Sequence, residues 1–96
     1  MKTVKEITQI LAEHKEEIRQ KYGVKIIGIF GSYARNEQKE TSDIDILIEL
    51  ERPIGLKFFE LWDYIENLLG CEVDLVRQKI LREEIRDDVL KAVVLI

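Results

Sequence analysis

The fold class that the sequence predicts is α/β (α+β): a small mixed sheet of three or more strands with helices packed on one face. Long stretches with the apolar periodicity of helices alternate with short apolar segments that have the pattern of strands. The chain has 96 residues, of which 46% are apolar, so it can bury one modest core. We therefore expect one domain that spans residues 1–96.

Two long helices have clear boundary signals. The helix over about residues 3–21 begins with a capping box, Thr-Val-Lys-Glu, and ends before Gly23. A second helix, over about residues 56–69, is closed by Gly70. Trp62 in this second helix has the spacing of a core residue, which favours packing over a base-stacking role.

Three short segments predict strands, over residues 25–30, 43–50 and 72–76. The first is nearly all apolar, which is typical of a buried central strand. The second alternates with a period of two, so Asp43 and Asp45 face the same side, roughly 6–7 Å apart at a rise of about 3.3 Å per residue. The third repeats the alternation, with Asp74 on its polar face. If these two strands pair, the three carboxylates form one all-oxygen cluster, which suits Mg²⁺.

Gly31 and Ser32 directly follow the first strand and predict a turn into a short helix. The backbone N–H groups at a helix start and the Ser32 hydroxyl can hold phosphate oxygens, and the glycine lets a phosphate approach the backbone. Arg35 could neutralise phosphate charge, with a simple surface role as the alternative. Taken alone, a Gly-Ser pair is most often a turn and an Asp-x-Asp a solvated strand face. Their order along the chain favours a site for metal-dependent nucleotide transfer.

The last part of the sequence predicts a helix from about Ile80 and then an apolar tail. This helix carries Asp87-Asp88, a rival carboxylate pair. Neighbours on a helix point about 100° apart, so the two cannot converge on one metal ion and a solvated face is favoured. The tail, residues 93–96, either packs back on the sheet or marks an interface with another chain. A homodimer or a hetero-complex is therefore possible.

Composition argues against several other classes of function. The net charge is −4 and the chain has no basic run, which argues against a direct nucleic-acid surface. The single cysteine, Cys71, and the single histidine, His14, leave no thiolate metal site and little support for Ser/His or Cys/His catalysis. No apolar run has the length of a membrane span and the first residues lack a signal-peptide core. We therefore expect no membrane association and a cytoplasmic location.

The segments 31–35, 42–48 and 72–76 together resemble the minimal nucleotidyltransferases (MNT) of the polymerase-beta superfamily. Asn36 stands where that family usually has glycine. The resemblance implies a polymerase-beta-like nucleotidyltransferase fold. It also implies a set of functional residues: Asp43, Asp45 and Asp74 as the catalytic and metal-binding carboxylates, for two Mg²⁺ ions, and Gly31, Ser32 and Arg35 as the nucleotide-binding residues, for ATP.

Many members of this family are the antitoxin half of HEPN/MNT toxin–antitoxin pairs. The resemblance therefore implies transfer of AMP from ATP to a hydroxyl, that of a tyrosine, on a HEPN-type toxin, which silences the toxin. Two alternatives remain open at this point. One is a non-catalytic antitoxin that neutralises its partner by direct contact. The other is a nucleotidyltransferase that acts on a small hydroxylated molecule.

Overall fold

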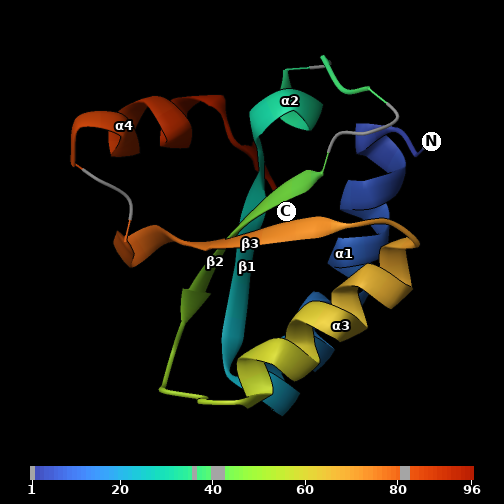
Figure 1. Ribbon diagram of the computed structural model, residues 1–96, viewed down its shortest axis with the longest axis vertical. Coiled ribbons are helices and arrows are strands. Elements are labelled where there is room, and N and C mark those ends of the chain that lie inside the picture. Colours follow the sequence, from blue (N-terminus) through green and yellow to red (C-terminus); the bar gives the residue numbers. More distant parts are fainter. Residues whose placement is uncertain (1, 36, 40–42, 81–82) are drawn as a thin grey trace.

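The computed structural model of the protein describes residues 2–35, 37–39, 43–80 and 83–96 (Figure 1). The elements follow in the order α1 (Val4–Tyr22), β1 (Val24–Phe30), α2 (Gly31–Ala34), β2 (Ile44–Leu50), α3 (Lys57–Leu69), β3 (Val73–Arg77), a 3₁₀ helix η1 (Gln78–Ile80), α4 (Glu83–Ala92) and β4 (Val94–Leu95). Asn36, part of the polar loop before β2 and residues 81–82 lie outside the described residues. Within the described ranges, no helix combines the length and apolar character needed to cross a membrane.

The strands form one sheet in the order β3-β2-β1-β4. β1 pairs antiparallel with β2 and with β4, whereas β2 pairs parallel with β3, so the sheet is mixed, as predicted. Because of these directions, the C-terminal end of β1 lies beside the N-terminal ends of β2 and β3. Figure 1 shows α2 at this same end of the sheet. The fold thus brings the glycine turn and the first residues of both acidic strands together at one end of the sheet.

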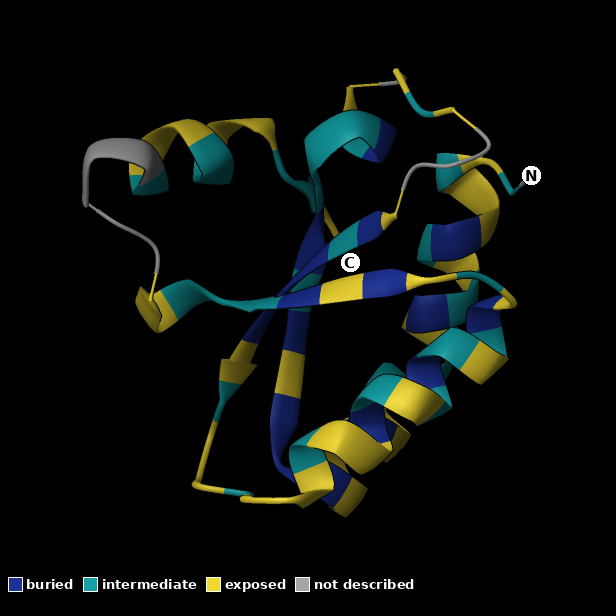
Figure 2. Ribbon diagram, in the orientation of Figure 1, coloured by how far each residue is buried: buried dark blue, intermediate teal, exposed yellow. Residues whose placement is uncertain are grey.

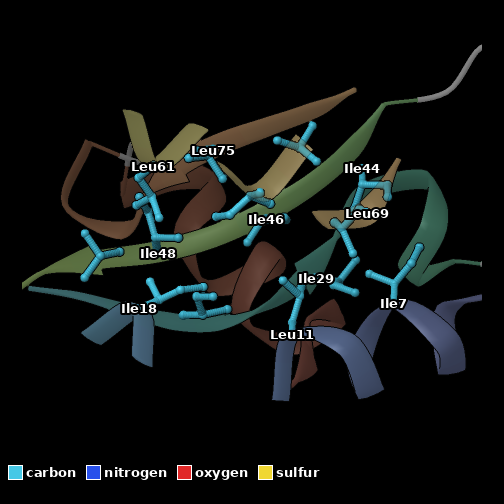
Figure 3. Packing of buried hydrophobic residues seen from close by; sticks show 14 of the residues in the cluster. Ile7, Leu11, Ile18, Ile29, Ile44, Ile46, Ile48, Leu61, Leu69 and Leu75 are labelled. Carbon is cyan, nitrogen blue, oxygen red and sulfur yellow. The ribbon is translucent and has the colours of Figure 1, made fainter. Parts of the chain in front are cut away.

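α1 and α3 lie side by side and cover one face of the sheet (Figures 1 and 2). Between them and the strands lies one core of mainly aliphatic side chains, each removed almost completely from water (Figure 3). Burying one such side chain stabilises the fold by about 1.5–3 kcal/mol. The fully buried members include Ile7, Leu11, Ile26, Ile29, Ile44, Ile46, Ile48, Leu61 and Ile65.

The predicted helix boundaries are close to the observed ones, because the capping chemistry is in place. The Thr3 hydroxyl accepts a hydrogen bond from the Glu6 N–H (3.2 Å), and the Glu6 carboxylate accepts one from the Thr3 N–H (3.3 Å). Gly23 and Gly70 end α1 and α3 with left-handed φ angles of 71° each.

The opposite face of the sheet is less open than the alternation of β2 suggests. Leu47 lies on the face of the acids, yet it is fully buried and does not belong to the main core cluster. α4 lies on this side (Figure 1), where its Leu90 lines a depression with Ile27 and Glu49. Ile27 is also the position of a register shift between β1 and β2, so strict alternation fails there.

The apolar tail packs back on the sheet as β4, which is one of the two alternatives for this segment. Leu95 is the register partner of Gly28, and the Ile96 N–H donates to the Ile27 carbonyl (3.1 Å). The Lys15 ammonium donates to the Ile96 carbonyl (2.8 Å). The Leu95 side chain itself is 72% exposed.

Candidate active site

The pairing of β2 with β3 brings two of the three predicted carboxylates together. Asp45 and Asp74 are register partners in the parallel pair, so their side chains stand on the same face of neighbouring strands. On its other side, Asp45 is the register partner of Phe30, the last residue of β1. Asp43 directly precedes β2, and the Ile44 N–H that follows donates to the Glu72 carbonyl (3.2 Å). Asp45 is half-buried, whereas Asp43 and Asp74 are exposed.

The electrostatics of Asp45 reflect this crowding. The pKa of its carboxyl group is raised above the ordinary 3.8, first by burial and then by the charges of Asp74 and Asp43. The charge of Arg35 lowers the pKa of Asp45, but this is the smallest contribution. The half-buried carboxyl group of Asp45 is therefore the one that burial and the neighbouring charges perturb.

Gly31 is required by Asp45 rather than by the backbone alone. Gly31 has a φ of +75°, and a Cβ atom placed there would lie 3.0 Å from the Asp45 Cγ and closer still to its Oδ2. The sequence predicted that the missing side chain makes room for a phosphate. In the structure, the Asp45 carboxylate occupies this space, because Phe30 and Asp45 are opposite each other in the sheet. Gly31 thus permits the position of the buried carboxylate.

Ser32 is the second residue of α2 and is half-buried. The first N–H groups of any helix lack partners within the helix, and the residue before α2, Phe30, provides no side-chain cap. The Ser32 carbonyl accepts a hydrogen bond from the Glu37 N–H (2.8 Å), which folds the chain after α2 back against the turn. The backbone N–H groups at the start of α2 and the Ser32 residue therefore lie at the same end of the sheet as Asp45.

Arg35 follows α2, is exposed, and donates from its Nε to the Glu37 carboxylate (3.1 Å). This ion pair matches the surface role that the sequence left as an alternative. Its positive charge also slightly lowers the pKa of Asp45. A nucleotide-binding role for Arg35 remains a prediction.

Two residues of α3 that the sequence did not connect with the site hold the strand that carries Asp74. The Glu66 carboxylate accepts a hydrogen bond from the Val73 N–H (3.0 Å), and the Trp62 indole N–H donates to the Val73 carbonyl (3.0 Å). The prediction that Trp62 packs is confirmed, since it lies against the core cluster. Glu66 was missed. The only signal in the sequence is the spacing of four between the two residues, which puts them on one helix face.

The chemistry of the carboxylates fits a divalent cation. All three donors are carboxylate oxygens, which hard cations such as Mg²⁺ prefer, and a cation would offset the burial and the neighbouring negative charges that raise the Asp45 pKa. Among the described residues, however, no group of three or more His, Cys, Asp or Glu side chains is arranged so that it could hold a metal ion. Asp45 and Asp74 are therefore adjacent, but the described carboxylates are not arranged as a complete set of metal ligands.

The rival pair, Asp87 and Asp88, is exposed on α4, which agrees with a solvated helix face. A hollow of ≈ 510 Å³ lies elsewhere, at the Leu50 end of β2, where Phe59 and Arg77 are among its lining residues. It is separated from Asp45 by most of the length of β2 and contains none of the predicted site residues.

This fold and the placement of its carboxylates point to the nucleotidyltransferases as the class of protein. The profile of the family described as "Nucleotidyltransferase domain" matches residues 11–96, and the chain belongs to this family. A solved structure described as "Structure of putative minimal nucleotidyltransferase" superposes with a TM-score of 0.78. It has 30% sequence identity and the match covers 95% of this chain and 94% of that one.

Curated relatives extend over most of the chain. "Protein adenylyltransferase MntA" of Thermococcus cleftensis is 52% identical over 95 residues, 98% of this chain and 96% of that protein. "Putative protein adenylyltransferase MJ1215" of Methanocaldococcus jannaschii is 62% identical over 77 residues, 79% of this chain and 90% of that protein. The resemblance to minimal nucleotidyltransferases, the fold and the enzyme class are thereby confirmed.

Proposed function

We propose that this protein is a Mg²⁺-dependent protein adenylyltransferase, which transfers AMP from ATP to a hydroxyl group of a partner protein. The observation that carries the proposal is the register pairing of Asp45 with Asp74, with Gly31 giving the Asp45 carboxylate its room. The names of the relatives from Thermococcus cleftensis and Methanocaldococcus jannaschii support transfer of AMP and a protein as the acceptor.

In the proposed reaction, Asp43, Asp45 and Asp74 would hold the divalent ions at this end of the sheet, and the triphosphate of ATP would be oriented through those ions. Bound divalent ions, two in the proposal, would neutralise the phosphate charge and the carboxylates together. The Ser32 hydroxyl and the first N–H groups of α2 donate to the terminal phosphates, and Arg35 adds positive charge at the same end of the sheet.

The acceptor hydroxyl oxygen attacks the α-phosphorus and forms a new O–P bond. The bond between the α-phosphorus and the bridging oxygen breaks, and pyrophosphate leaves with that oxygen. We assign to Asp74, which is exposed and is the register partner of Asp45, the role of taking the proton of the attacking hydroxyl. The product is AMP joined to the acceptor by a phosphodiester bond.

The acceptor we propose is a tyrosine of a HEPN-type toxin, which makes this protein an antitoxin that acts in the cytoplasm as a single domain over residues 1–96. Asp43 and Asp74 are exposed to solvent, so the surface of a partner protein can cover the site and the bound nucleotide. The resemblance to HEPN/MNT pairs supports the identity of that partner.

The experiment combines the protein with a HEPN-type toxin encoded beside its gene, in the presence of labelled ATP and Mg²⁺, and measures the intact mass of the toxin. We expect the toxin to gain one or more AMP units at a substoichiometric amount of this protein. Asp45→Asn should abolish the gain. Asp87→Asn, which removes the same charge from the exposed face of α4, is the matched control and should transfer AMP at the wild-type rate.

Tight binding of the toxin with no gain of mass would reject the transfer reaction and favour a contact antitoxin. Transfer that persists in Asp45→Asn would reject the role of the carboxylates. A mass gain on a small hydroxylated molecule, and none on the toxin, would reject the protein acceptor.

A further inference from the structure

We propose that Glu66 and Trp62 are positioning residues: together they clamp the edge strand β3 so that Asp74 stands beside Asp45. This inference rests on the proposed function, because it concerns the geometry of that carboxylate pair. It assigns a role in the reaction to α3, a helix that contributes no residue to the predicted site.

The clamp consists of two hydrogen bonds to one residue. Glu66 accepts from the Val73 N–H and Trp62 donates to the Val73 carbonyl, each at 3.0 Å. The two side chains are one helical turn apart, on the face of α3 that looks toward the sheet. They form hydrogen bonds with both the N–H and the carbonyl group of Val73, as the backbone of a neighbouring strand would.

β3 needs such a substitute because it is the edge of the sheet, with β2 on one side only. The polar groups of a strand that point away from its neighbour have no partner within the sheet. Val73 is 4% exposed, so water has little access to compensate for a lost partner. The Trp62 ring is itself held by an edge contact with the Phe58 ring, with centroids 5.7 Å apart and planes at 82°. This contact helps to orient the indole N–H toward the Val73 carbonyl.

Asp74 is the residue directly after Val73, and this adjacency connects the clamp with the site. β3 spans only five residues, and a slip of one residue would turn Asp74 to the opposite face of the sheet, away from Asp45. Hydrogen bonds to both polar groups of Val73 oppose such a slip. They fix the register Asp45–Asp74 at the residue next to the carboxylate.

The role predicts a specific difference between two substitutions of the same residue. Glu66→Ala removes the acceptor, whereas Glu66→Gln removes only the charge and keeps a carbonyl oxygen that can accept from the Val73 N–H. A purely electrostatic effect of Glu66 on the nearby carboxylates would be equal in both. An effect through position appears in Glu66→Ala and is rescued in Glu66→Gln.

The test uses the whole chain and Mn²⁺ as the probe. The electron paramagnetic resonance signal of free Mn²⁺ gives the dissociation constant. The broadening of amide signals by substoichiometric Mn²⁺ in ¹H–¹⁵N spectra compares β3, at Asp74, with β2, at Asp45. Glu60→Gln is the matched control, because Glu60 is an exposed carboxylate of the same helix.

We expect Glu66→Ala to weaken Mn²⁺ binding about tenfold or more, in the range typical of residues that orient metal ligands. The broadening at Asp74 should fall relative to that at Asp45. Glu66→Gln and Glu60→Gln should bind Mn²⁺ within about twofold of the wild type. If Glu66→Ala does not fold, Trp62→Phe replaces it, since it removes the indole N–H and keeps an aromatic ring; the same loss at Asp74 is expected.

Unchanged Mn²⁺ binding in folded Glu66→Ala or, in its place, Trp62→Phe would overturn the inference. So would an equal loss in Glu66→Gln and Glu66→Ala, which would indicate charge rather than position. Asp45→Asn separates this failure from that of the proposed function. If Asp45→Asn abolishes Mn²⁺ binding while Glu66→Ala does not change it, only the clamp is rejected. If Asp45→Asn binds Mn²⁺ like the wild type, the carboxylate site itself is rejected.

Discussion

The close approach of Gly31 to Asp45 makes Gly31→Ala the most direct test of the site geometry. A Cβ atom at Gly31 would meet the Asp45 side chain, with its Cγ at 3.0 Å and its Cβ at 3.3 Å. Separations this short force one of the two groups to move. Since Gly31 is the first residue of α2 and directly follows β1, we expect the Asp45 carboxylate to be displaced from its place beside Asp74.

Gly70→Ala is a matched control because Gly70 has nearly the same backbone conformation without the clash. Its φ is +71°, compared with +75° at Gly31, and no atom lies within 4 Å of an added Cβ. A left-handed conformation costs a residue with a side chain about 1–2 kcal/mol. At an unfolding entropy of about 2.1 cal/mol/K per residue, a chain of this size loses about 5 °C in Tm for each kcal/mol. Gly70→Ala should therefore lower Tm by about 5–10 °C and leave AMP transfer unchanged.

Gly31→Ala should lower Tm by at least as much and also reduce AMP transfer to the partner about a hundredfold, the typical effect of a 1 Å misplacement at a reacting centre. Thermal unfolding by circular dichroism and the rate of AMP transfer measure the two effects separately. The reasoning is refuted if Gly31→Ala transfers AMP at the wild-type rate. It is equally refuted if Gly70→Ala loses as much activity as Gly31→Ala, because backbone strain alone would then account for the loss.

Three further predictions concern stability, each measured by thermal or urea unfolding without metal ions. Asp45→Asn should raise Tm at pH 7: the raised pKa of Asp45 means that its ionised form opposes folding above the folded-state pKa. This gain in Tm should shrink as the pH falls through the folded-state pKa toward 3.8, because the native wild type then takes up the proton. No gain at pH 7 would contradict the cost of ionising Asp45 in its half-buried place beside Asp74 and Asp43. Ile46→Ala, at a fully buried position, should cost about 2–5 kcal/mol, and a cost below about 1 kcal/mol would indicate that the core repacks. Thr3→Ala removes the hydroxyl of the capping box and should cost about 1 kcal/mol, with no change in AMP transfer; an unchanged midpoint would mean that the first turn of α1 frays in the wild type.

The parts of the fold that sequence alone predicts are those that depend on neighbours along the chain. The capping box at Thr3 and the glycines that end α1 and α3 define helix ends through local hydrogen bonds and local backbone angles, and both helices were found within a residue or two. The period of two in β2 likewise predicts that Ile44 and Ile46 are buried, because side-chain alternation is a local property. These predictions need no knowledge of the partner elements.

The parts that escaped prediction depend on which elements meet. β4 has only two residues, and nothing in a two-residue segment distinguishes a strand from an apolar tail. Leu47 is buried although it shares the face of the acids, and α4 lies on that side of the sheet. The position of α4 depends on tertiary packing, which the local pattern of β2 does not contain. The register shift at Ile27 also arises from pairing with β2, not from the sequence of β1.

The same division holds within the candidate site. The spacing of Asp43 and Asp45 is local, and the sequence could relate Asp74 to them only on the condition that two strands pair, which they do. Gly31 makes room for the Asp45 carboxylate because Phe30 and Asp45 are register partners in the sheet. The two residues are distant along the chain, so local patterns do not reveal this contact. The contact of Glu66 with Val73 joins a helix to a strand, and no periodicity encodes it.

Asp45 is the point at which stability and the proposed reaction conflict. It is half-buried, it has two carboxylates as neighbours, and it depends on a glycine with a left-handed backbone. Burial and the two neighbouring carboxylates disfavour the ionised form of Asp45 in the folded state, and proteins retain such local costs mainly where a function requires them. The stabilising features are elsewhere: the aliphatic core lies beneath α1 and α3, and the two hydrogen bonds to Val73 come from α3. Because α3 both covers the core and holds the edge strand β3, the packing that stabilises the fold also fixes the strand that carries Asp74.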